Sequence, residues 1–165
     1  MKTVLLSLIV FLVASLSISA QNGTKSIEES FNILRAKEDV AFFEVSKEMF
    51  EMLAESETTP PELKTYYKQL TNLKMIENQS SSRNELQTLY EPFLSQTNLK
   101  GFNRLMVSER SNEKISFMKN KTKDGKNEFL LISNKTVIYI LGEIDLKSIH
   151  EFEMVLKIAG NALGR

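Results

Sequence analysis

The stretch from Phe102 to Leu141 constrains the fold most, because short apolar runs alternate there with turn residues. Asp-Gly between apolar runs is a strong hairpin signal, and Asp124-Gly125 supplies one. We therefore predict an antiparallel meander whose last two strands, apolar on both faces, lie centrally and are covered on both sides. Its four strands are expected at Arg104–Glu109, Lys114–Lys119, Glu128–Ile132 and Thr136–Leu141.

The region before the meander is predicted to be mostly helical. Ser26 and Glu29 fit a capping box, and apolar residues then recur at helical spacing. Pro60-Pro61 suits a helix start, where the missing N–H of proline costs nothing, and Leu70 completes the apolar stripe of that helix. The expected order is a helix over Ile27–Ala36, a strand at Val40–Val45, a helix after Ser46, a helix after Pro60 and a short strand at Leu73–Ile76.

Two further helices complete the predicted fold. One spans Asn84–Phe93, where Pro92 should kink or end it. The other closes the chain after a second capping box at Ser148, with an apolar stripe that includes Ile149 and Leu156. The fold class is α+β, a single domain with a mostly antiparallel sheet and a C-terminal four-strand meander packed against helices. The domain is expected over residues 21–165, with its core at about 27–158.

The first twenty residues have the layout of a secretory signal peptide. Lys2 gives a positive start, Val4–Ala14 is apolar, and small residues lead to Ala20 before the polar Gln21. We predict cleavage between Ala20 and Gln21, with cleavage after Ser19 and an uncleaved anchor as the alternatives. The protein is therefore expected to be exported, either periplasmic or secreted. After leader removal no stretch is long enough to span a membrane.

Charge and residue counts exclude several kinds of site. The 21 basic and 21 acidic residues cancel, so no global field draws the chain to nucleic acid or to an anionic membrane. No cysteine is present, which excludes disulfides, thiolate metal sites, cysteine nucleophiles and a lipid anchor on cysteine. His150 is the only histidine, whereas zinc sites use several His or Cys ligands. We predict no cofactor, no metal and no catalytic residue.

Three stretches together resemble a known family. They are the join from Val45 to Met52, the meander beginning near Phe102, and the segment Leu141–Leu146 before the closing helix. Behind the leader, this order resembles the bacterial exported family catalogued as domain of unknown function 4252, over roughly Ile27–Leu156. Many members of that family look like lipoproteins, whereas this chain has Ala20-Gln21 in place of a cysteine. The resemblance implies no activity and no site residues.

One basic cluster is a candidate ligand patch. Lys119, Lys121 and Lys123 alternate along a predicted strand and so share a face, and Lys126 follows the turn. These lysines could hold a phosphorylated lipid or polysaccharide, or they could form a charged hairpin tip that discourages edge-to-edge pairing. Five methionines could line an adaptable groove, but their helix and strand spacings favour the core: Met49, Met52, Met75, Met106 and Met118.

The combined observations favour a non-enzymatic binding or interaction module of the cell envelope. Its partner would be an envelope protein or a glycan. The alternatives are a hydrolase or carbohydrate-active enzyme that uses glutamates, and a purely structural envelope protein. A cleft with two converging carboxylates would support the enzyme, because glycosidases need such a pair at a fixed distance.

Overall fold

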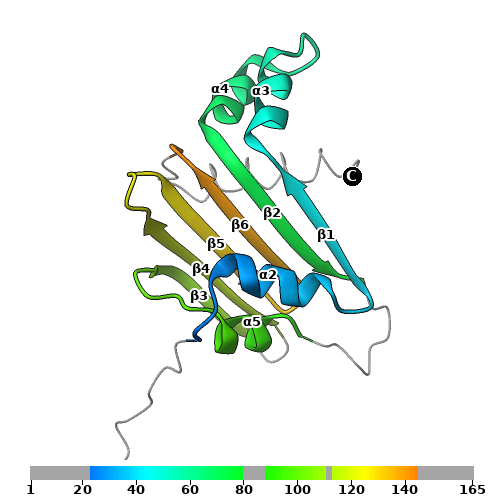
Figure 1. Cartoon of the computed structure of the whole chain (residues 1–165), viewed down its shortest axis with the longest axis vertical. Coiled ribbons are helices and arrows are strands. Elements are labelled where there is room, and N and C mark those ends of the chain that lie inside the picture. The colour runs from blue at the N-terminus through cyan, green and yellow to red at the C-terminus, as the bar shows by residue number, and fades with distance from the viewer. Residues whose placement is uncertain (1–22, 80–87, 111–112, 145–165) are drawn as a thin grey trace, which may run out of the picture.

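A six-stranded sheet with four helices makes up the described part of the chain, which in the computed structural model covers residues 23–79, 88–110 and 113–144 (Figure 1). The strand order is β1-β2-β6-β5-β4-β3, and every neighbouring pair is antiparallel, which confirms the α+β fold class. The elements are α2 (Ile27–Arg35), β1 (Val40–Val45), α3 (Lys47–Glu55), α4 (Pro61–Gln69), β2 (Leu70–Asn78), α5 (Tyr90–Gln96), β3 (Asn103–Arg110), β4 (Glu113–Lys121), β5 (Asn127–Ser133) and β6 (Thr136–Gly142).

The predicted meander is confirmed as β3 to β6. Gly125 in the β4–β5 turn has a φ of 90°, a left-handed conformation that glycine adopts without steric cost. Strands β5 and β6 lie in the centre of the sheet and contribute to the apolar clusters on both of its faces. Their central position follows from the pairing of β6 with β2, which joins the meander to the N-terminal half of the chain.

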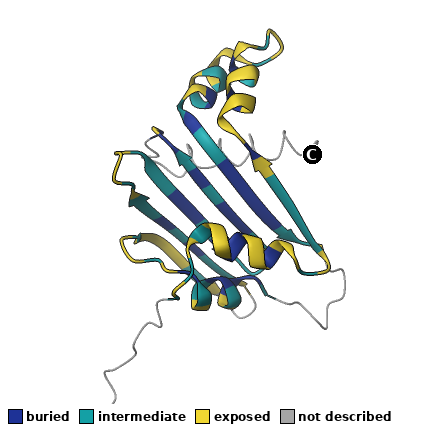
Figure 2. Cartoon of the chain, viewed as in Figure 1, coloured by how far each residue is buried: buried dark blue, intermediate teal, exposed yellow. Residues whose placement is uncertain are grey.

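Helices α2 and α5 cover one part of one sheet face (Figures 1 and 2). Phe31 of α2 is buried, and its ring meets the rings of Phe93 and Phe42 edge to face at 5.7 and 6.4 Å. Edge-to-face contact places a positive ring edge against a negative ring face. The predicted capping box starts α2, because the Ser26 hydroxyl accepts from the amide of Glu29 at 3.2 Å.

Helices α3 and α4 form a pair beyond one end of the sheet, between β1 and β2 in the chain (Figure 1). Phe50 of α3 stacks on Tyr67 of α4 with ring centroids 6.0 Å apart. Both rings belong to the apolar cluster on the sheet face opposite Phe31, which also contains Leu73 and Ile140. This helical pair therefore closes the core at the end where β1 stops and β2 begins.

The structure corrects three local predictions. Leu70 is not part of the α4 stripe: its backbone is extended (φ −86°, ψ 136°), and β2 begins there. The helix predicted over Asn84–Phe93 does not include residues 88 and 89; instead α5 starts at Tyr90. Pro92 therefore lies in its first turn, where no intrahelical donor is lost. The closing helix predicted after Ser148 lies outside the described residues.

The prediction that the methionines lie in the core is wrong for three of the five. Met75 and Met118 are buried, but Met49 and Met52 on α3 and Met106 on β3 are exposed. Helical spacing alone misassigned Met49 and Met52, because Phe50 and Ala54 occupy the buried stripe of α3. No helix in the described ranges is both long enough and apolar enough to cross a membrane.

The Phe31 contacts predict a large stability effect. Phe31→Ala should lower the free energy of unfolding by about 3–5 kcal/mol, because it leaves a cavity between α2, α5 and β1. Ile33→Ala, at an exposed position on the same helix, should change it by only about 0.5 kcal/mol. Urea unfolding followed by circular dichroism measures both variants. Equal effects would contradict the position of α2 on the sheet.

Candidate functional site

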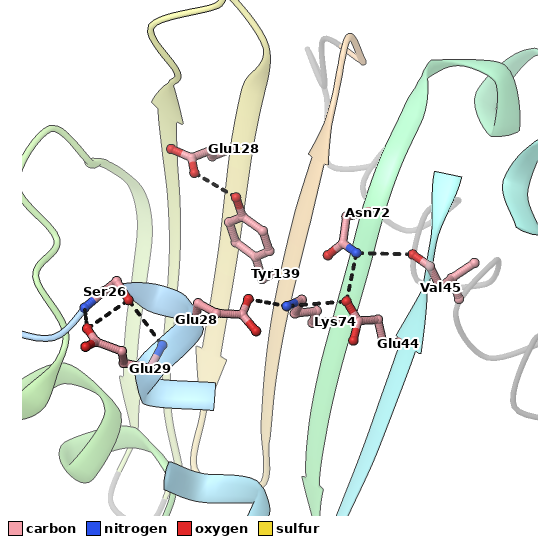
Figure 3. A network of polar contacts seen from close by, with 9 residues as sticks. All are labelled: Ser26, Glu28, Glu29, Glu44, Val45, Asn72, Lys74, Glu128 and Tyr139. Carbon is pink, nitrogen blue, oxygen red and sulfur yellow. Dashed lines mark hydrogen bonds and ion pairs between the residues drawn. The ribbon is translucent and has the colours of Figure 1, made fainter. Parts of the chain in front are cut away.

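The sheet face that carries α2 changes from apolar to polar toward the end near α3 and α4. Ile76 and Val137 form an apolar pair under α2. Two residues along each strand, on the same face, Lys74 is paired with Tyr139. We call the polar side chains at this end of the face the polar floor (Figure 3). Figure 3 draws five of them, Glu44, Asn72, Lys74, Glu128 and Tyr139, and the sixth is Asn120, which donates to Glu128.

Lys74 is the cation at the centre of the polar floor. Its side chain is only 10% exposed, and its ammonium forms ion pairs with Glu28 of α2 and, at 3.3 Å, with Glu44 of β1. A buried lysine requires such partners, because an unpaired charge is costly to remove from water. The two ion pairs therefore tie the first turn of α2 to the two N-terminal strands.

Asn72 holds the carboxylate of Glu44 from the other side. The amide nitrogen of Asn72 donates to Glu44 Oε1 at 3.0 Å and to the carbonyl of Val45 at 3.5 Å. The hydrogen bond from Asn72, followed by the charge of Lys74, lowers the pKa of Glu44. Glu44 is therefore ionised at neutral pH and has both partners in place.

Tyr139 and Glu128 form the second half of the polar floor. The hydroxyl of Tyr139 donates to Glu128 Oε1 at 2.7 Å, and the amide of Asn120 donates to Glu128 Oε2 at 2.7 Å. Burial, and then the hydrogen bond to Glu128, raise the pKa of Tyr139 far above its ordinary value. Tyr139 is therefore a neutral hydrogen-bonding group rather than a base.

An open cleft of about 530 Å³ lies between the start of α2 and this floor. Three carboxylates line it, and none of the described residues that line it is a lysine or an arginine. Glu29 is one of the three, and hydrogen bonds from the backbone and hydroxyl of Ser26 lower its pKa. The lining residues are Thr24, Ser26, Ile27, Glu28, Glu29, Asn98, Glu128 and Tyr139.

The carboxylates of the cleft are already engaged in contacts within the protein. Lys74 pairs with Glu28, Ser26 donates to Glu29, and Glu128 accepts at both oxygens. A glycosidase-like pair instead needs one protonated acid and one carboxylate facing across the bond to be cleaved. Within residues 23–79, 88–110 and 113–144, no group of three metal-ligating side chains lies close enough to hold an ion. The arrangement provides fixed hydrogen-bonding groups.

The structure divides the predicted lysine patch. Strand β4 ends at Lys121, so Lys123 lies in the turn, and its predicted alternation with Lys119 and Lys121 on one strand is wrong. The ammonium of Lys119 lies 5.3 Å from the ring centre of Phe129, and Lys126 pairs with Asp124 at 3.4 Å. A second hollow, of about 400 Å³, is lined by Asn103, Leu105, Lys119, Asn120, Lys121 and Asn127.

Sequence reasoning missed the polar floor. A usable signal was present: Lys74 interrupts a buried run between Leu73 and Met75, which is unusual for a lysine without partners. The cleavage residues Ala20 and Gln21, together with His150, lie outside the described residues.

Comparison with known proteins identifies the family and nothing more specific. The family model described as Domain of unknown function (DUF4252) matches residues 33–152. The chain belongs to this family. No curated protein and no solved structure matched the chain.

The Asn72 contact predicts a measurable titration. Because the folded protein lowers the pKa of Glu44, this carboxylate stabilises the fold above its unfolded pKa, and the stabilisation is lost as the pH falls through the folded pKa. Asn72→Ala should raise the pKa of Glu44 and weaken this acid dependence. NMR titration of the glutamate carboxyls measures the pKa. The pKa of Glu48, lowered by Ser46, is the internal control and should not change.

Proposed function

We propose that this member of the domain of unknown function 4252 family is an exported, non-enzymatic binding module of the bacterial cell envelope. We further propose that it binds a neutral, hydroxyl-rich ligand such as a glycan in the cleft between α2 and the polar floor. One observation carries the proposal: the cleft is lined by carboxylate, amide and hydroxyl groups, several of them held by hydrogen bonds within the protein.

The charges of the cleft favour a neutral ligand over an anionic one. Glu28, Glu29 and Glu128 would repel phosphate or sulfate, and the nearest buried cation, Lys74, already carries two carboxylates. Sugar hydroxyls both donate and accept hydrogen bonds, so they can use carboxylate oxygens and the amide of Asn98. Groups that are already held in place lose little freedom when a ligand binds.

Binding also fits the site better than catalysis. The hydrogen bond from Asn72, followed by the charge of Lys74, lowers the pKa of Glu44, and Glu128 has hydrogen-bond donors on both oxygens. A general acid needs a raised pKa, which a buried or like-charged setting would supply. The carboxyl of Glu44 has the opposite setting, because its neighbours lower its pKa.

Export is the second part of the proposal and rests on the N-terminal sequence. Lys2, the apolar run Val4–Ala14 and the small residues up to Ala20 follow the order that a signal peptidase substrate needs. With no cysteine in the chain, processing would release a protein without a lipid anchor, either periplasmic or secreted. Glycans of the envelope would then be accessible to the cleft.

Ligand binding can be tested with neutral hexasaccharides of glucose and of N-acetylglucosamine, using a heparin hexasaccharide as the polyanionic comparison. We expect NMR shift changes at cleft residues for a neutral sugar and none for heparin. Glu128→Gln should weaken binding by about tenfold, because the acceptor on Tyr139 and Asn120 loses its charge. Glu143→Gln, exposed and outside the cleft, is the matched control. Binding of heparin alone would contradict the proposal.

Export predicts a defined processing product. The protein recovered from the envelope of the producing bacterium should begin at Gln21 by N-terminal sequencing. Ile9→Arg places a charge in the apolar run and should leave an unprocessed chain in the cytoplasm, whereas Thr3→Ser should be processed normally. Recovery of an intact N-terminus from the wild-type envelope fraction would overturn the cleavage.

A further inference from the structure

Strand β3 is an edge strand with an exposed apolar surface. It ends the strand order, and within the described residues it pairs only with β4. Leu105, Met106 and Val107 are 52%, 36% and 46% exposed, and Figure 2 colours much of this strand as exposed. Soluble proteins commonly protect such an edge with charged side chains, proline or a bulge; residues 103–110 contain no lysine or proline, but they carry charged residues at both ends of the apolar run.

The opposite edge of the sheet differs. Strand β1 carries no large apolar side chain that is exposed, and its Glu44 is held by Lys74 and Asn72. The exposed apolar residues of the sheet are therefore confined to one edge. An edge strand is a template on which another strand of complementary charge can be added.

An irregularity in β3 sets which side chains share a face. Arg104 is opposite Met118 and Met106 is opposite Phe117, so Leu105 is an extra residue of a bulge. As a result, Arg104, Val107 and Glu109 lie opposite three alternate residues of β4, namely Met118, Ser116 and Lys114. Alternate residues of a strand point to the same face, so these three side chains of β3 form one row.

This row is self-complementary under two-fold symmetry. Glu109 lies two strand positions from Val107 on one side, and the bulge brings Arg104 to the equivalent distance on the other side. If two copies of β3 pair antiparallel with Val107 on the axis, Arg104 is opposite Glu109 of the partner subunit, and the contact occurs twice. Opposite residues of an antiparallel pair point to the same face, so each pair can form a salt bridge.

We propose that the protein forms a homodimer in which β3 pairs with β3 of a second copy, joining the two sheets edge to edge. Isologous pairing of this kind uses one surface twice and closes after two subunits. Arg104 and Glu109 form no salt bridge within the described residues; Glu109 lies opposite Lys114 of β4, whose ammonium pairs with Glu91 at 2.6 Å. The pairing covers Val107 and the neighbouring apolar side chains.

Charge reversal tests the dimer. The full chain, expressed with its own leader and purified after processing, should have a dimeric mass in sedimentation equilibrium at concentrations up to about 200 µM. Arg104→Glu and Glu109→Arg each place like charges opposite one another twice, and each should weaken self-association by about tenfold or more. The double variant R104E/E109R restores opposite charges and should dimerise again.

Mixing the two single variants gives the sharpest result. A copy with Arg104→Glu and a copy with Glu109→Arg present opposite charges at both contacts, so the mixture should form a heterodimer at concentrations at which each variant alone is mostly monomeric. Met52→Lys, at the exposed apolar site on α3, is the matched control and should leave the dimer unchanged. Circular dichroism and thermal melting confirm that each variant folds. A monomeric wild type, or single variants that remain dimeric, would overturn the proposal.

Discussion

The pairing of β2 with β6 is the contact on which the rest of the molecule depends. Strand β2 follows the N-terminal helices and β1, and β6 is the last strand of the meander, so their hydrogen bonds unite two halves that are distant in sequence. Both strands place apolar residues on both faces, which lets one sheet support an apolar cluster on each side. Near Leu70 the strands approach closely: a Cβ on Gly142 would lie 2.3 Å from the carbonyl oxygen of Gln69.

The sheet face under α2 combines two environments. Phe31 and the apolar residues around it form one half of this face. The other half is polar, because Lys74 and its two paired carboxylates lie there (Figure 3). The same helix contributes to both, since Phe31 packs into the apolar half and Glu28 reaches Lys74. The cleft is thus positioned by the core, and rigid elements rather than loops carry its floor.

Local sequence signals predicted most of the fold. The capping box at Ser26, the Asp124-Gly125 turn and the two apolar central strands each depend on neighbouring residues, so a pattern could identify them. The limits of β2 could not be predicted in this way, because Leu70 fits both a helical stripe and a strand until its partner Gly142 is known.

The polar floor was unpredictable for a related reason. Its ion pairs join residues 28, 44 and 74, and its hydrogen bonds join 120, 128 and 139, so no short motif records them. The shared strand face predicted for Lys119, Lys121 and Lys123 was wrong for the opposite reason. The regular spacing of these lysines predicted a shared strand face, but β4 ends before Lys123, since the turn at Gly125 requires the chain to reverse there.

The strand order has a consequence for how the chain acquires its structure. Because β6 lies between β2 and β5, the inner edge of β2 has no partner until residue 142 has emerged from the ribosome. Contacts between such distant segments must close a long loop before they return any free energy, which slows folding. The N-terminal strands of this topology can therefore join the complete sheet only after the meander has been synthesised.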